Sequence, residues 1–246
     1  MSQTSVSEAT MGVDRAGVPY RRLWFIATLL TGTFSMSISQ SALSTAYPTL
    51  MRTFNIGTPA VQWLTTGFML IMCVMIPVSP WLLNNVPFGT LFRSVIAAFA
   101  VGTLICLVAP TYPILLIGRL IEAVGVGIIF PSFQTVLLTI TSKEHRGQTM
   151  GTAGLIMGAA LAVGPIISGI VLQWASWRGL FGLFLVLVTG VFIASWWTIR
   201  DVMPLTPTTI DGWSVLASTG FIGLLYVLNR WGGLVNFQWV SLDCWL

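Results

Sequence analysis

Residues 113–139 read PILLIGRLIEAVGVGIIFPSFQTVLLT, and this stretch decides the class of fold. It holds 27 residues, of which only Arg119 and Glu122 are ionisable. An α-helix needs about 20 mostly apolar residues to cross the hydrocarbon core of a bilayer. The stretch therefore predicts a membrane-spanning helix that carries an arginine and a glutamate at membrane depth.

The composition extends this prediction to the whole chain. Of its 246 residues, 55% are hydrophobic and 7% are charged, and the mean hydropathy is +0.88. Soluble domains carry roughly 25% charged residues, so this chain could not cover a surface exposed to water. Three cysteines make no disulfide scaffold, and the positive charges are scattered rather than clustered as for nucleic-acid binding. The sequence predicts an all-α integral membrane protein.

Turn-forming residues divide the chain into predicted spans. A polar tail over residues 1–20, expected to be mobile and cytoplasmic, precedes a six-helix bundle over 21–200. Residues 201–246 are expected to form a linker, a shorter seventh helix and the truncated start of an eighth. The predicted spans are 23–46, ended by Tyr47-Pro48, then 61–83, 91–109, 113–139, 148–173, 179–199 and 212–229.

The distribution of Lys and Arg predicts the orientation in the membrane. With the N-terminus inside, the inner segments hold seven of these residues and the outer segments hold three. Cytoplasmic loops carry the excess of Lys and Arg, so we expect a cytoplasmic N-terminus in a multi-pass protein of the cell membrane, plasma or inner. Four tryptophans near predicted span ends fit this arrangement, since Trp is enriched at membrane interfaces: Trp174, Trp177, Trp196 and Trp197.

The sequence offers no arrangement of catalytic residues. The only histidine, His145, lies in a charged loop beside Lys143, Glu144 and Arg146, where a solvated role is the simplest interpretation. No group of metal-ligating residues, phosphate-binding glycine loop or pair of carboxylates is present in the sequence. We therefore expect no enzyme, no metal and no cofactor beyond an ion gradient, for which protons are the first candidate.

Arg119 and Glu122 are the informative residues, because an ionisable group at a helix centre costs roughly 2.5–3.5 kcal/mol on insertion scales. If the helix begins near Pro113, a rise of 1.5 Å per residue places Glu122 about 14 Å deep, close to the middle of the bilayer. A spacing of three puts both side chains on one helical face. They are either a transport and coupling site that faces a central cavity or an ion pair that lets an arginine cross the membrane.

The first predicted helix is unusually polar. It carries seven Ser and Thr residues between 31 and 44, together with Gln40. A helix that faced only lipid would not need them, so Ser39 and Gln40 are expected to line a wet cavity. Counting from Leu23 puts Ser39 roughly level with Arg119.

The fifth predicted helix is rich in glycine and contains a proline. Small residues let helices approach closely in lipid, and a proline within a helix permits a bend. Gly158, Gly164, Pro165 and Gly169 therefore mark either helix packing alone or a bent helix at a moving interface.

Several motifs together resemble one family. The run from Gly118 to Gly125 resembles the fourth-helix motif of major facilitator drug exporters, and Gly158 to Gly169 resembles their fifth-helix antiporter motif. Residues 63–70 are similar to the second-helix pattern of the 14-helix drug:proton antiporters. The first helix of that group ends in Ala-Leu-Pro and its sixth begins with Trp-Arg, which Ala46-Tyr47-Pro48 and Trp177-Arg178 resemble.

The resemblance implies the N-terminal half of a proton-driven exporter of amphipathic compounds, with a substrate site at the midplane between two six-helix bundles. The chain departs from the family at two positions that matter. The first-helix aspartate is Ser39 here, and the fourth-helix glutamine is Glu122. We therefore hypothesise that Glu122 takes over the role of the missing acid.

The sequence is compatible with two functions. The chain is an incomplete transporter, active with a second half or a second copy, or it is a truncated membrane protein that does not transport and packs against a full-length relative or has no activity. Its partners are the lipid bilayer, a small amphipathic substrate and a second transporter half. The sequence identifies neither the substrate nor the coupling ion, and it leaves export against uptake open.

Overall fold

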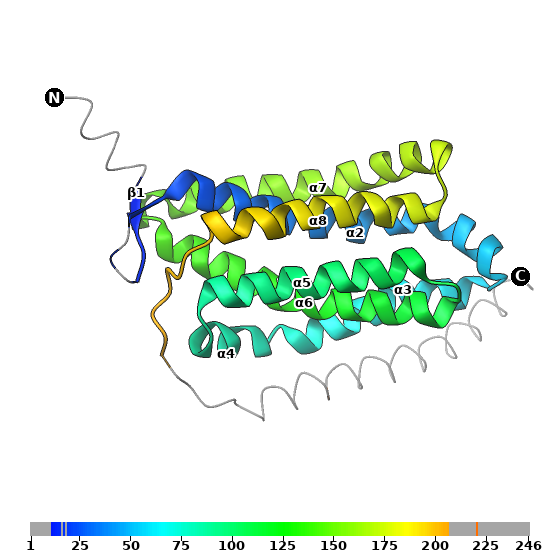
Figure 1. Cartoon of the computed structure of the whole chain (residues 1–246), viewed down its shortest axis with the longest axis horizontal. Coiled ribbons are helices and arrows are strands. Elements are labelled where there is room, and N and C mark those ends of the chain that lie inside the picture. The colour runs from blue at the N-terminus through cyan, green and yellow to red at the C-terminus, as the bar shows by residue number, and fades with distance from the viewer. Residues whose placement is uncertain (1–10, 16, 18, 207–219, 221–246) are drawn as a thin grey trace, which may run out of the picture. The chain divides into compact units, whose positions relative to one another are not determined.

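The computed structural model describes residues 11–15, 17, 19–206 and 220 (Figure 1). The chain divides into two units, Met1–Thr208 and Thr209–Leu246, and the first contains nearly all described residues. The predicted seventh helix and the start of an eighth lie outside the described residues. The elements are β1 (Met11–Val13), β2 (Pro19–Arg21), α2 (Arg22–Phe54), α3 (Thr58–Met75), α4 (Val78–Asn85), α5 (Phe88–Val108), α6 (Tyr112–Ile140), the short 3-10 helix η1 (Lys143–His145), α7 (Arg146–Trp174) and α8 (Trp177–Thr198).

The first unit is a bundle of long helices that run alongside one another (Figure 1). Helix α5 packs against α6 and α8, α2 packs against α7 and α8, and α3 packs against α6. Two apolar clusters fill the bundle. One surrounds Phe92 and Phe99, and the other surrounds Leu64 and Trp177. The prediction of an all-α membrane fold is confirmed.

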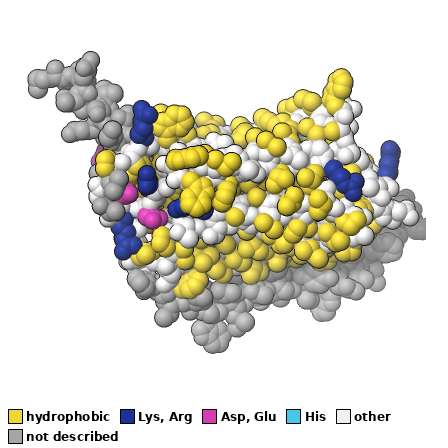
Figure 2. Space-filling view, in the orientation of Figure 1, with side chains coloured by type: hydrophobic (Ala, Val, Ile, Leu, Met, Phe, Trp, Pro, Cys, Tyr) yellow, Lys and Arg dark blue, Asp and Glu magenta, His cyan; other side chains and the backbone are white. Residues whose placement is uncertain are grey.

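Among the described residues, five helical segments are long and apolar enough to cross a membrane: Thr58–Met75, Phe88–Val108, Tyr112–Ile140, Lys143–Trp174 and Trp177–Thr198. Figure 2 shows the corresponding apolar surface between two ends that carry Lys and Arg side chains. Helix α2 is not among the five although it has 33 residues. Its many Ser and Thr residues lower its hydropathy, and it lies inside the bundle against α7 and α8.

The structure corrects the expected end of the first helix. Helix α2 contains Pro48 and continues to Phe54, so Tyr47-Pro48 does not end it. A proline inside a helix removes one backbone hydrogen bond but need not stop the helix when tertiary packing holds it. The end comes at Asn55, whose left-handed backbone (φ 51°) caps the helix.

Two further boundaries differ from prediction. The second predicted span is two helices, α3 and α4, because Pro77 cannot donate the hydrogen bond that would continue α3. The polar tail is not wholly irregular, since β1 and β2 pair as an antiparallel hairpin with Met11 opposite Arg21. The Arg15 N–H donates to the carbonyl of Asp201 at 2.9 Å and ties this hairpin to the segment after α8.

Close approach of α5 and α6 depends on two glycines. A Cβ on Gly102 would lie 2.7 Å from the carbonyl oxygen of Gly118, and a Cβ on Gly118 would lie 2.6 Å from the Cys106 sulfur. Glycine is the residue that lets helix backbones approach this closely within a membrane. This crossing sets the distance from α5 to Glu122 on α6.

Candidate functional site

Helix α6 presents Arg119 and Glu122 to the interior of the bundle. The Arg119 side chain is 2% exposed and that of Glu122 is 0% exposed, and the Arg119 Nη1 atom forms an ion pair with Glu122 Oε2. The ion pair that the spacing of three predicts is therefore present. The role of these residues in transport stays a prediction.

Three other helices contact this pair. From α5, the Thr103 hydroxyl donates a hydrogen bond of 2.7 Å to Glu122 Oε1. From α3, the Phe68 ring lies 4.4 Å from the Arg119 guanidinium carbon, a cation–π contact. From α2, the Ser39 hydroxyl lies 3.5 Å from Arg119 Nη1. The pair is thus the point where four helices of the bundle meet.

The hydrogen bonding of the pair is incomplete on the arginine side. Both carboxylate oxygens of Glu122 have a donor, Thr103 for one and Arg119 for the other. The Nε atom of Arg119 is buried and has no hydrogen-bond partner. A buried donor without a partner costs free energy, so Arg119 has unused capacity to bind a further acceptor.

Three of the polar residues of α2 are bonded within the helix itself, and the expectation that this helix lines a wet cavity stays a prediction. The hydroxyls of Thr33, Ser35 and Ser37 are buried and donate to backbone carbonyls one turn earlier in α2. Such bonds let a hydroxyl lie in an apolar environment without water. Ser39 differs, because its hydroxyl accepts from Arg119, and Gln40 beside it is half-buried. The prediction that Ser39 lies level with Arg119 is confirmed.

The glycines predicted to matter in α7 lie in two different environments, one in a helix contact and two in open space. A Cβ on Gly164 would collide with the Ser41 hydroxyl and lie 3.1 Å from the Ala42 nitrogen, so Gly164 lets α7 approach α2. The adjacent Pro165 lies inside α7 on its exposed side. A Cβ on Gly158 or Gly169 would meet nothing within 4 Å. The structure places Gly164 in a helix contact and leaves Gly158 and Gly169 on open surface.

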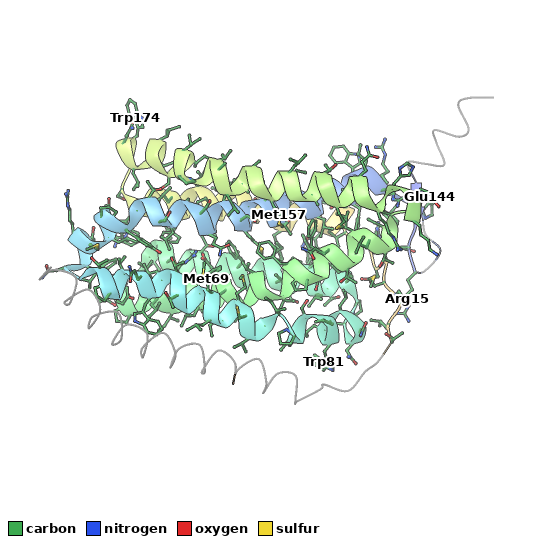
Figure 3. All side chains as sticks on the ribbon, turned by 180° about the vertical axis from the view of Figure 1, so that it is seen from behind. Arg15, Met69, Trp81, Glu144, Met157 and Trp174 are labelled. Carbon is green, nitrogen blue, oxygen red and sulfur yellow. The ribbon has the colours of Figure 1, made fainter. Side chains whose placement is uncertain are left out.

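Of the four tryptophans predicted near span ends, three are exposed in the structure and one is buried. Figure 3 shows Trp174 at one end and Glu144 at the other. Trp174, Trp196 and Trp197 are 87%, 59% and 72% exposed, as interfacial tryptophans should be. Trp177 is buried instead, since its ring packs against Phe54 at 5.5 Å.

Sequence reasoning missed Thr103 and Phe68. Thr103 is one of few polar residues in the apolar run 91–109, and this was the available signal. Phe68 lies within the 63–70 motif, but nothing in the sequence marked it as a contact of Arg119. Among the described residues, no group of three or more His, Cys, Asp or Glu could hold a metal ion.

The comparisons with known proteins agree on a family. The profile of the Major Facilitator Superfamily matches residues 29–242. The chain is 39% identical over 224 residues to the uncharacterized MFS-type transporter YcnB of Bacillus subtilis, covering 91% of this chain and 47% of YcnB. It is 33% identical over 222 residues to the lincomycin resistance protein LmrB of Bacillus subtilis, covering 89% of this chain and 46% of LmrB.

Solved structures show the same fold at low identity. A peptide transporter POT crystallised with sulfate superposes with a TM-score of 0.66 at 11% identity, over 87% of this chain and 47% of that one. A bacterial homologue of the human lysosomal transporter Spinster gives 0.60 at 17% identity, over 76% of this chain and 46% of that one. The chain spans about half the length of the relatives it matches. It belongs to the Major Facilitator Superfamily.

Proposed function

We propose that the chain forms the N-terminal bundle of a proton-coupled exporter of amphipathic compounds, in the cell membrane with its N-terminus in the cytoplasm. The observation that carries this proposal is the buried pair of Arg119 and Glu122, which contacts three other helices. A titratable group at the midpoint of a helix bundle is expensive, and its usual reason is transport.

Glu122 is the proposed proton carrier. Counting from Tyr112 at 1.5 Å per residue, it lies about 15 Å along α6, near the middle of the roughly 30 Å hydrocarbon core. Protonation of Glu122 removes the charge that compensates Arg119. An uncompensated buried charge costs about 3–5 kcal/mol. The protonated state therefore favours an arrangement in which Arg119 reaches water or another acceptor, and this couples the proton to a rearrangement of the helices.

The position of Ser39 supports this role. The family that the sequence resembles has an aspartate there and a glutamine at the position of Glu122. In this chain both positions contact the same atom, Nη1 of Arg119. The Ser39 hydroxyl lies 3.5 Å from it and the Glu122 carboxylate forms an ion pair with it. The acid has therefore changed helix but still contacts the same arginine.

The proposed substrates are amphipathic drug-like compounds. Relatives with about a third of their residues identical are named for resistance to lincomycin, and a multidrug resistance protein B homologue of Mycobacterium tuberculosis is 30% identical over 146 residues. Lincomycin and ethidium are suitable first substrates to test.

A second bundle is proposed to complete the transport path. The chain covers 47% of YcnB. Helix α7 carries Gly151, Gly154 and Gly158 on open surface, and such small residues favour contact with another helix in lipid. In superfamily members the substrate site lies between two such bundles.

The test is drug-driven proton movement in everted membrane vesicles that contain the natural gene product. Addition of ethidium or lincomycin to acidified vesicles should release protons, followed with a pH-sensitive dye. Glu122→Gln should abolish the release because the side chain can no longer carry a proton. Glu144→Gln, which removes an exposed acid, should leave it unchanged. Proton release by Glu122→Gln equal to that of the unmodified protein contradicts the proposal.

A further inference from the structure

A groove between α2 and α8 opens on the surface of the bundle at the end where α2 begins. Its volume is about 580 Å³, within the range of roughly 300–1,000 Å³ that small-molecule pockets occupy. Ala27, Val186, Gly190 and Ile193 are among the residues that line it. The hydroxyls of Thr28 and Thr198, which also line it, bond to each other at 2.9 Å, so the groove presents a largely apolar wall.

The groove continues into a pocket of different chemistry. This second pocket has a volume of about 290 Å³ and is lined by Tyr20, Arg21 and Arg200 among others. It shares Trp24, Trp197 and Thr198 with the groove, so the two spaces adjoin. None of the described residues that line the pocket is a carboxylate. The neighbouring Asp201 is turned to the start of α5, where its Oδ1 accepts from the Gly89 N–H at 2.7 Å.

We propose that the groove and the pocket together bind one anionic phospholipid, with an acyl chain in the α2–α8 groove and the phosphate on Arg21 and Arg200. Arginine binds phosphate oxygens with charge-assisted hydrogen bonds. Tyr20 adds a neutral hydroxyl, because burial raises its pKa, and of the charged groups near it Arg22 lowers the pKa and Asp14 raises it. Two positive charges without a lining acid match an anionic headgroup better than a zwitterionic one.

The length of the groove fits a lipid in one leaflet. On α8 it extends from Val186 to Thr198, a rise of about 18 Å over twelve steps of 1.5 Å. Half of the hydrocarbon core is about 15 Å thick. Trp24 and Trp197 are 56% and 72% exposed at the junction of groove and pocket, the depth at which tryptophan marks the membrane interface. Figure 2 shows the apolar surface running up to Lys and Arg side chains at this end.

The test is native mass spectrometry of the natural gene product that contains this chain, stripped of lipid in detergent and titrated with palmitoyl-oleoyl phosphatidylglycerol or phosphatidylcholine. The proposal predicts one tightly bound phosphatidylglycerol. Arg21→Gln with Arg200→Gln should weaken its binding about 30-fold, since each arginine contributes roughly a factor of five. The binding of phosphatidylcholine should change little. The control pair Arg52→Gln with Lys143→Gln removes two exposed charges outside the pocket and should have no effect.

A second variant tests the groove without changing charge. A Cβ on Gly190 meets nothing within 4 Å, so Gly190→Leu fills the groove and leaves the bundle undisturbed. It should lower the affinity for both lipids. Phosphatidylglycerol binding that survives both the arginine pair and Gly190→Leu overturns the proposal, as does equal competition by inorganic phosphate. Wild-type dimers that dissociate in Gly190→Leu also overturn it, because a second copy then occupies the groove. None of these outcomes depends on whether the chain transports.

Discussion

Arg119 is held between a hydroxyl on α2 and a carboxylate on its own helix. If the acid of the family has moved from the first position to the second, moving it back should preserve the chemistry. We expect Glu122→Gln to lose drug-driven proton release and the double variant Ser39→Asp with Glu122→Gln to recover a substantial part of it. The measurement is the rate of proton release in everted vesicles at equal protein level.

The matched control for this rescue is Ser44→Asp with Glu122→Gln. Ser44 lies on α2 but is exposed, and its hydroxyl donates to the Ser41 carbonyl. An acid there cannot pair with Arg119, so this variant should stay inactive. Equal activity of the two double variants would show that any added acid suffices and that contact with Arg119 is irrelevant.

Thr103 stabilises the charged pair from α5. Its hydroxyl donates 2.7 Å to Glu122 Oε1 within a fully buried environment. Thr103→Val keeps the volume but removes the donor, so we expect the free energy of unfolding to fall by about 1.5–3 kcal/mol, the typical contribution of a hydrogen bond to a charged group. Thermal unfolding in detergent measures this, with Thr152→Val on the exposed side of α7 as the control. Equal unfolding temperatures for the two variants would contradict the assigned hydrogen bond.

For single residues, the sequence predicted the contacts that the spacing along one helix determines. A spacing of three fixed the Arg119–Glu122 pair, and counting along two helices placed Ser39 level with Arg119. Thr103 and Phe68 could not be predicted the same way. Their contacts depend on how α5 and α3 cross α6, and crossing geometry is set by packing between helices rather than by spacing within one.

The close crossing of α5 and α6 leads to a prediction about how tightly these two helices pack. A Cβ on Gly102 would lie 2.7 Å from the Gly118 carbonyl oxygen and 3.0 Å from the Glu122 nitrogen, and backbone atoms cannot give way as side chains do. We expect Gly102→Ala to separate the helices and to cost about 1–3 kcal/mol of stability, typical of overpacking. Thermal unfolding again provides the measurement.

Gly158→Ala is the control for this crossing. A Cβ there meets nothing within 4 Å, so the change should be neutral or should stabilise α7 by up to about 1 kcal/mol through helix propensity. If Gly102→Ala is as stable as Gly158→Ala, the close contact between α5 and α6 does not hold the bundle together.

Helix boundaries show where sequence reasoning succeeds and fails for elements. The fourth predicted span, 113–139, differs from α6 by one residue at each end. The first predicted span ends too early at Pro48, because α2 continues through this proline to Phe54 while packed against α7. The second was read as one helix because hydropathy stays high across the break at Pro77.

For the whole molecule, the six long helical stretches and their order follow from composition and turn residues. Their arrangement cannot be predicted in this way. In lipid an apolar helix face gains little by packing against another apolar face, so small residues and polar contacts determine which helices pack together. Gly102, Gly118 and Gly164 form such close contacts here. The sequence marked Gly164 as a packing residue and Gly118 only as part of a motif, and it did not mark Gly102. The open face of α7 is the surface on which the proposed second bundle would pack.

The proposed exporter depends most on that second bundle, and the size of the natural gene product tests its presence directly. Membranes of the organism that encodes the chain are blotted with an antibody against residues 1–20, beside an expressed standard of 26.7 kDa that corrects for anomalous migration. Relatives about twice as long predict a band near twice the mass of the standard. A band level with the standard would contradict the account, since no covalently linked second bundle would then exist to complete the transport path.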